Sequence, residues 1–128
     1  MTPQERAAYL AATIDCDGNI ELLKTKRKRE YWLPRVCVEV ACPRLVAWLV
    51  ENYGGNIYQR PLRQPHHRQL YRWHLAGVGA VNALKAAQQY LITKRKRAAL
   101  AVEFAEVVNP DRRTEIVREL AMRNRRGF

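Results

Sequence analysis

The sequence predicts a single α+β domain in which helices cover one face of a four-stranded antiparallel sheet. Its 128 residues are enough for one ordinary hydrophobic core. Two pairs of segments alternate apolar and polar residues, as half-buried strands do, and an apolar pattern of helical spacing precedes each pair. The predicted order is αββαββα with further helix at the end. Since no linker interrupts it, we expect one domain over residues 1–122 and a frayed basic tail over 123–128.

The first element is a helix over residues 3–14. Thr2, Pro3 and Glu5 form a capping box, with Thr2 at the N-cap and Pro3 at the first helical position. Gly18 is suited to a left-handed turn that ends the helix. The apolar positions fall on one helical face: Ala7, Leu10, Ala11 and Ile14.

Two strands follow, joined by a turn that we expect to contain Glu30. The first alternates apolar and polar residues from Ile20, and the second places three valines on one face. Across both hairpins, the residues expected to face the core are Ile20, Leu22, Val36, Val38, Val40, Ile57, Tyr71, Trp73 and Leu75.

The second half repeats this pattern. Pro43 opens a second helix that ends at Gly54-Gly55, and a second hairpin follows over residues 56–62 and 69–76. A third helix begins after Gly77, and a further helix runs through residues 100–107. Asn109-Pro110 interrupts it, and we expect Asp111 to cap the last helix.

The charge balance indicates a polyanionic partner. Lys and Arg number 23 against 12 Asp and Glu, so the formal net charge is +11. This favours nucleic acid over a membrane, and no apolar run approaches the roughly 18 residues of a membrane span. Three cysteines, an odd number, fit a reducing intracellular compartment rather than a disulfide framework. The cysteines and histidines lack any recognised zinc-ligand spacing. The alternative to a zinc site is that some of the cysteines are small buried hydrophobic residues.

The acidic segment after the first helix suggests a cation site. Asp15 and Asp17 lie at the negative end of the helix dipole, where each carboxylate is disfavoured by about 0.3–1 kcal/mol. Carboxylate and carbonyl oxygens are the ligands that Mg²⁺ prefers. The same residues are also typical of a simple turn, so the chemistry alone leaves both interpretations open.

Residues 10–18, Leu-Ala-Ala-Thr-Ile-Asp-Cys-Asp-Gly, resemble the signature of the LAGLIDADG homing endonucleases. Ala12, Thr13 and Cys16 depart from the usual residues. Segments 54–57, 71–75 and 90–98 resemble family segments in the same order, so the resemblance covers about residues 7–106.

The resemblance implies a site-specific DNA endonuclease that makes a metal-dependent double-strand break in a long pseudo-palindromic target and leaves short 3′ overhangs. A single motif implies a homodimer on double-stranded DNA, with paired motif helices. The location implied is the cytoplasm of a prokaryote or phage host, or an organelle. The expected interface residues are Ala8, Ala11, Ala12 and Asp15, although small residues on a helix also line a protein's own core.

The resemblance also assigns roles at the site. Asp17 matches the metal-binding acid, the backbone carbonyl of Cys16 is a second ligand, and Asp15 matches a structural acid. Lys94 matches the lysine that polarises the attacking water or stabilises the developing charge, with Lys96 as the alternative. The implied cofactor is Mg²⁺; we expect Mn²⁺ to substitute and Ca²⁺ to bind without cleavage. By itself, the basic run 94–97 also fits a phosphate-binding patch or a nuclear-localisation-like segment.

A non-cleaving binder on the same scaffold, an intron RNA maturase or a DNA-binding regulator, is the alternative function. Thr13 favours it, as does Cys42, which stands where the family often has a water-ordering glutamine. Asp17 and Lys94 favour the enzyme.

The outer face of the sheet is expected to read DNA, because a two-stranded ribbon fits the major groove. Lysines and arginines beside it, namely Lys24, Lys26, Lys28, Arg63 and Arg68, are expected to meet phosphates. The outward residues are Glu21, Leu23, Thr25, Arg27, Arg29, Leu33, Arg35, Cys37, Glu39, Asn56, Tyr58, Arg60, Arg72 and His74.

Overall fold

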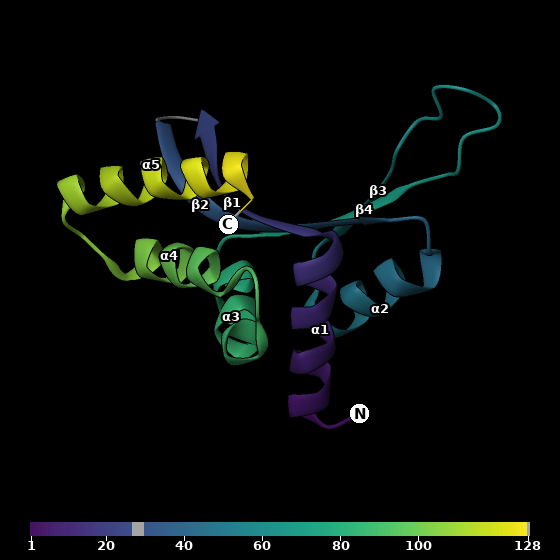
Figure 1. Ribbon diagram of the computed structural model, residues 1–128, viewed down its shortest axis with the longest axis horizontal. Helices are drawn as coiled ribbons and strands as arrows, with labels where there is room; N and C mark the ends of the chain where they lie inside the picture. Colours follow the sequence, from purple (N-terminus) through teal and green to yellow (C-terminus); the bar gives the residue numbers. More distant parts are fainter. Residues whose placement is uncertain (27–29, 128) are drawn as a thin grey trace.

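The computed structural model describes residues 1–26 and 30–127, and it confirms the predicted α+β class. Its four strands form one antiparallel sheet in the order β1-β2-β4-β3 (Figure 1). The elements are α1 (Pro3–Asp17), β1 (Gly18–Lys26), β2 (Glu30–Val40), α2 (Pro43–Tyr53), β3 (Asn56–Gln59), β4 (Tyr71–Ala76), α3 (Val78–Ala87), the 3₁₀ turn η1 (Gln88–Tyr90), α4 (Arg95–Glu106) and α5 (Pro110–Arg126).

Helix α1 is oriented end-on to the sheet. Figure 1 shows its carboxyl end at the sheet and its amino end pointing away, with α2 on one side and α3 and α4 on the other. The capping box is formed, since Glu5 N donates to Thr2 Oγ1 and Thr2 N donates to Glu5 Oε1. This orientation brings the acidic end of α1 to the level of the strands.

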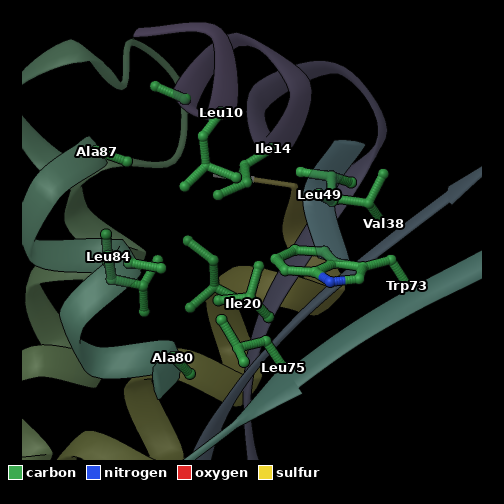
Figure 2. Close-up of a cluster of buried hydrophobic side chains, with 14 of the residues drawn as sticks. Leu10, Ile14, Ile20, Val38, Leu49, Trp73, Leu75, Ala80, Leu84 and Ala87 are labelled. Carbon is green, nitrogen blue, oxygen red and sulfur yellow. The ribbon is translucent and has the colours of Figure 1, made fainter. Parts of the chain in front are cut away.

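The main core lies between the sheet and helices α1 to α4 (Figure 2). Leu10 and Ile14 of α1 are completely buried, as are Trp73 of β4 and Leu84 of α3. Trp73 also keeps its polar atom satisfied, because Nε1 donates to the carbonyl of Gly54 at 2.8 Å. An aromatic side chain of this size contributes a large share of the buried apolar area.

A second core cluster joins α5 to α4 and β1. It contains Leu100, Phe104, Ile116 and Leu120, with Leu22 of β1 packed against it. The last helix is capped by Asn109 rather than by the expected Asp111. The Asn109 side chain accepts from the backbone of Asp111 and Arg112, because Pro110 occupies the first helical position.

The expected frayed tail is wrong for residues 123–126, which belong to α5. Asn124 Nδ2 donates to the carbonyl of Ile20 at 2.9 Å. Because β1 is an edge strand, its outer carbonyls need partners from outside the sheet. The tail is therefore ordered by the sheet edge that it covers.

Two strand boundaries differ from the prediction. Glu30 pairs with Lys26 and so begins β2 instead of lying in the turn. Strand β3 ends at Gln59, and Ile57, expected in the core, is 44% exposed. This short edge strand pairs with β4 alone, so little lies beside it to cover its side chains. No helix in the described part of the chain has the length and apolar character needed to span a bilayer.

Gly18 ends α1 for a different reason from the expected left-handed turn. Its φ of −105° is extended backbone that other residues also adopt. A Cβ atom here would lie 2.7 Å from Ile14 Cα and 3.2 Å from the carbonyl oxygen of Cys37. Glycine is therefore required because the chain turns tightly against the last turn of α1 and also lies close to the backbone of β2.

We predict that Gly18→Ala lowers the free energy of unfolding by about 2 kcal/mol, because the added methyl group meets backbone atoms that cannot move alone. Urea unfolding measures this. Gly79→Ala in α3 is the matched control: its Cβ would meet only the flexible end of Leu75, so it should be neutral or stabilising. Equal stability of the Gly18→Ala and wild-type proteins would contradict the close-approach argument.

Candidate functional site

The end of α1 is joined to the start of α4 by the carboxylate of Asp15. Its two oxygens accept from Ile92 N at 2.7 Å, Lys94 N at 3.0 Å and Thr93 Oγ1 at 3.0 Å. Lys94 is the N-cap of α4, so this carboxylate satisfies donors at the positive end of that helix. Burial alone would raise the pKa of Asp15, but these hydrogen bonds outweigh it and lower the pKa.

Lys94 makes the reciprocal contact. Its Nζ atom donates to the carbonyls of Ile14 at 2.8 Å, Asp15 at 3.1 Å and Gly18 at 2.7 Å. An ammonium group has three donors, and here each has a carbonyl acceptor. Its charge also lies at the negative end of the α1 dipole. We call Asp15 and Lys94, with these six hydrogen bonds, the α1–α4 clasp.

The clasp gives Lys94 a structural role that the sequence did not predict. With all three donors engaged by backbone, the ammonium anchors the end of α1 while keeping its positive charge beside Asp17. Burial lowers the pKa of Lys94 and nearby Arg97 lowers it further, although Asp15, Cys16 and Asp17 act in the opposite direction. Lys96, the alternative catalytic lysine, is exposed in the first turn of α4.

The basic run 94–97 is not a uniform patch. Arg97 is only 5% exposed, and its Nε atom is buried without a hydrogen-bond partner among the described residues. It faces the core side of α4 together with Ala98 and Ala101. Helical spacing carries a signal for this burial, because Leu100, Ala101 and Phe104 follow Arg97 by three, four and seven residues and lie on the same buried face of α4.

Asp17 is the acid that the clasp leaves out. It is the last residue of α1 and is exposed, and its carboxylate forms no hydrogen bond or ion pair within the described ranges 1–26 and 30–127. A carboxylate and a backbone carbonyl at a helix carboxyl end are hard oxygen donors that suit a divalent cation such as Mg²⁺. The described residues contain no cluster of three or more His, Cys, Asp or Glu side chains able to hold a metal.

The exposed face of α1 carries small side chains. Ala12 and Cys16 are exposed, Ala8 is half-buried, and Tyr9 is 47% exposed. The expectation that Ala11 lies at the dimer interface is wrong, because Ala11 is completely buried in the chain's own core. Helical spacing alone places Ala11 midway between the Leu10 and Ile14 side and the Ala8 and Ala12 side, so its burial is decided by what packs against α1.

The sheet places most of the expected DNA-reading residues on one outer face. The register pairs Cys37 with His74 and His74 with Asn56, and it pairs Arg72 with both Glu39 and Tyr58. The expected residues that lie on this face are Glu21, Leu23, Thr25, Leu33, Arg35, Cys37, Glu39, Asn56, Tyr58, Arg72 and His74. Arg60 follows β3 and reaches Glu39, whereas Arg27 and Arg29 lie outside the described residues.

Cys37 corrects one of these expectations. It points toward the outer face but is only 4% exposed, so it cannot itself contact a base. Long neighbours cover it: Arg72 NH2 donates to its sulfur at 3.4 Å, and its thiol donates to Glu21 Oε1 at 3.8 Å. All three cysteines are free thiols.

Comparison with solved structures identifies the fold. The archaeal intron-encoded homing endonuclease I-Vdi141I, complexed with DNA, matches with a TM-score of 0.70 and 17% identity, over 92% of this chain and 83% of that one. I-CvuI, in complex with its target, matches with a TM-score of 0.66 and 18% identity, over 93% and 77%. I-SmaMI, bound to uncleaveable DNA, matches with a TM-score of 0.66 and 16% identity, over 91% of this chain and 44% of that one. No family model and no curated protein matches the sequence.

The chain therefore has the LAGLIDADG homing endonuclease fold, and the resemblance seen in residues 10–18 is confirmed at that level. The motif forms the carboxyl half of α1 and the turn into β1. Thr13, its least typical residue, is accommodated because its hydroxyl donates to the carbonyl of Tyr9 at 2.9 Å.

We predict that Asp15→Asn lowers the free energy of unfolding by about 0.5–2 kcal/mol at neutral pH, as loss of a helix cap does. The folded pKa of Asp15 lies below its unfolded value of 3.8. Its extra stability is therefore present above that pH and lost as the pH falls through the folded pKa. The difference between wild type and variant should shrink below about pH 4.

Asp17→Asn is the matched control in the same unfolding series. Its carboxylate forms no hydrogen bond or ion pair among the described residues and lies at the negative end of α1, so the variant should keep wild-type stability or gain a few tenths of a kcal/mol. Equal losses of unfolding free energy in Asp15→Asn and Asp17→Asn would contradict the claim that only Asp15 takes part in the clasp.

Proposed function

We propose that this protein is a metal-dependent, site-specific DNA endonuclease that acts as a homodimer. The observation that carries the proposal is the exposed carboxylate of Asp17, which has no hydrogen bond or ion pair among the described residues. It lies at a helix end where Lys94 engages the carbonyls of Ile14, Asp15 and Gly18. The fold supports it, since similar structures such as I-Vdi141I are homing endonucleases with bound DNA. The net charge of +11 supports a nucleic acid partner.

Asp17 and the backbone carbonyl of Cys16 would hold Mg²⁺. The carbonyl of Cys16 is not one of the three that Lys94 engages. When bound beside a scissile phosphate, such an ion supplies an activated water and stabilises the departing oxygen. The chain's own contribution is to hold the Asp17 carboxylate at the helix end and to keep the Lys94 charge beside it. Mn²⁺ would substitute, whereas Ca²⁺ would bind without cleavage.

A second copy of the chain would complete the site. The small side chains of Ala8 and Ala12 on the outer face of α1 would let the α1 helix of another copy approach closely. Asp15, also expected at the interface, is already hydrogen-bonded within its own chain. Pairing two such faces about a twofold axis would bring two Asp17 carboxylates to the same end of the helix pair. Twofold symmetry in the protein implies a pseudo-palindromic target.

The outer face of the sheet would lie in the major groove, with the basic residues around it on phosphates. Arg63 and Arg68 lie in the exposed β3–β4 connection, and Lys24 lies on β1. Recognition across four strands suits a long target. Cleavage of both strands would leave short 3′ overhangs.

A non-cleaving binder on the same scaffold is the second candidate. The observation that favours it is Cys42, which lies exposed at the N-cap of α2 where the family often has a glutamine. Thr13 no longer favours it, because its hydroxyl is satisfied inside α1.

We predict that Asp17→Asn abolishes cleavage while DNA binding persists. Loss of the charge removes several kcal/mol of transition-state stabilisation, so the rate should fall at least about a thousandfold. The measurement is single-turnover cleavage in Mg²⁺ and binding in Ca²⁺ on a duplex enriched from a randomised library. Asp111→Asn, an exposed acid in the first turn of α5, is the control and should cut normally.

Cleavage by Asp17→Asn at the wild-type rate would refute the metal-ligand assignment. A wild-type protein that binds the enriched duplex but never cuts it, with Mg²⁺ or Mn²⁺, would support the non-cleaving binder instead.

We also predict that Ala12→Arg converts a dimer into a monomer, because a long charged side chain prevents close approach of two α1 helices. Size-exclusion chromatography with light scattering measures the mass of each species. Ala105→Arg, on an exposed position of α4, is the matched control and should remain dimeric. A monomeric wild type that still cuts both strands would exclude this arrangement.

A further inference from the structure

Three arginines on or beside the outer face have different partners. Arg35 Nε donates to Glu21 Oε1 at 2.7 Å, and Arg60 NH1 donates to Glu39 Oε1 at 2.5 Å. Both ion pairs reduce the positive charge that these two arginines present to DNA. Each must also be broken or shared before its arginine can turn fully toward a base.

Arg72 is held differently. Its NH2 group donates to the sulfur of Cys37 at 3.4 Å, and no carboxylate among the described residues forms an ion pair with it. Glu21 and Glu39 attract it only from a greater distance. Sulfur is a weak, uncharged acceptor, so this bond orients the guanidinium without neutralising it. One of its five donors is engaged, which leaves the others for a ligand.

The thiol is itself oriented by a second hydrogen bond. Cys37 donates its proton toward Glu21 Oε1 at 3.8 Å, which leaves the sulfur lone pairs on the side of Arg72. Arg35 fixes Glu21 in turn. Because Cys37 is only 4% exposed, its sulfur is confined by packing as well as by these bonds. A rigid acceptor therefore lies beneath the flexible end of Arg72.

Arg72 also has a central place on the face. It lies on β4, which pairs with β2 on one side and β3 on the other, and its register partners are Glu39 and Tyr58. Its side chain is half-buried rather than fully solvated. A preorganised guanidinium loses less conformational freedom on binding than a surface lysine does.

We infer that Cys37 is a positioning residue that holds the Arg72 guanidinium for bidentate recognition of a guanine edge in the DNA target. The inference rests on the proposed DNA recognition but not on cleavage. Arginine pairs with the O6 and N7 acceptors of guanine, and such a contact discriminates against other bases by about tenfold or more. In a symmetric dimer the guanine occurs once in each half-site.

The test is selection of bound duplexes from a randomised library in Ca²⁺, followed by sequencing, with wild type and variants. Arg72→Lys keeps the charge but not the planar fork, so it should lose the guanine preference at one position per half-site. Cys37→Ala should weaken the preference at those same positions by several-fold. Cys37→Ser, whose hydroxyl both donates and accepts, should weaken it less.

One control matches these variants. Arg44→Lys, an exposed arginine on α2, should leave every base preference unchanged. Unfolding curves establish that each variant is folded at the selection temperature. Arg72→Ala gives a second measurement of the same position, in which the guanine preference and some overall affinity are lost.

Each outcome has a definite meaning. Relaxation at one symmetric position by both Arg72→Lys and Cys37→Ala supports the inference. Uniform weakening across all positions by Arg72→Lys would make Arg72 a phosphate contact and overturn it. An unchanged guanine preference in Cys37→Ala would overturn the positioning role. If wild type enriches no sequence at all, the proposed DNA recognition fails, and this inference fails with it.

Discussion

Two helix ends of opposite partial charge meet in this structure, and the side chains of Asp15 and Lys94 bridge them. The carboxyl end of α1 is negative and the amino end of α4 is positive. Lys94 of α4 neutralises the first, and Asp15 of α1 neutralises the second. Each charge lies at the helix end that favours it. Such an interaction stabilises the fold by about 0.3–1 kcal/mol when the charge is exposed and by up to about 2 kcal/mol when it is partly buried. The clasp therefore joins two segments almost 80 residues apart.

This constraint explains why two neighbouring acids behave differently. Asp15 occupies an unfavourable place for a carboxylate, and three donors from residues 92–94 compensate it. Asp17 lies one half-turn further along, beyond the reach of those donors, and remains exposed. A carboxylate left at the negative end of a helix attracts a cation. The same contacts that stabilise the fold thus leave one acid available for chemistry, at the level of the sheet that would bind DNA.

Much of the architecture follows from local patterns. The capping box, the alternating valines and the Gly54-Gly55 stop each reflect interactions within a few residues, and all are found as predicted. The errors concern burial. Ala11 and Cys37 have a spacing compatible with exposed roles but are covered by residues distant in the sequence. Arg97 carries the same charge as its exposed neighbours, although its helical spacing from Leu100, Ala101 and Phe104 places it on the buried face of α4. Similarly, the donors that engage Asp15 come from residues 92–94, far away in the sequence, so local patterns could place that acid but not its partners.

A double-mutant cycle on the clasp is the most direct test of this account. Unfolding free energies of wild type, Asp15→Asn, Lys94→Met and the double variant give the coupling between the two side chains. Because each side chain helps to hold the junction at which the other acts, the account predicts a favourable coupling of about 1 kcal/mol, within the range found for shared networks. Losses that simply add, within about 0.3 kcal/mol, would show that the two residues act independently. That result would contradict the claim that one reciprocal contact holds the end of α1.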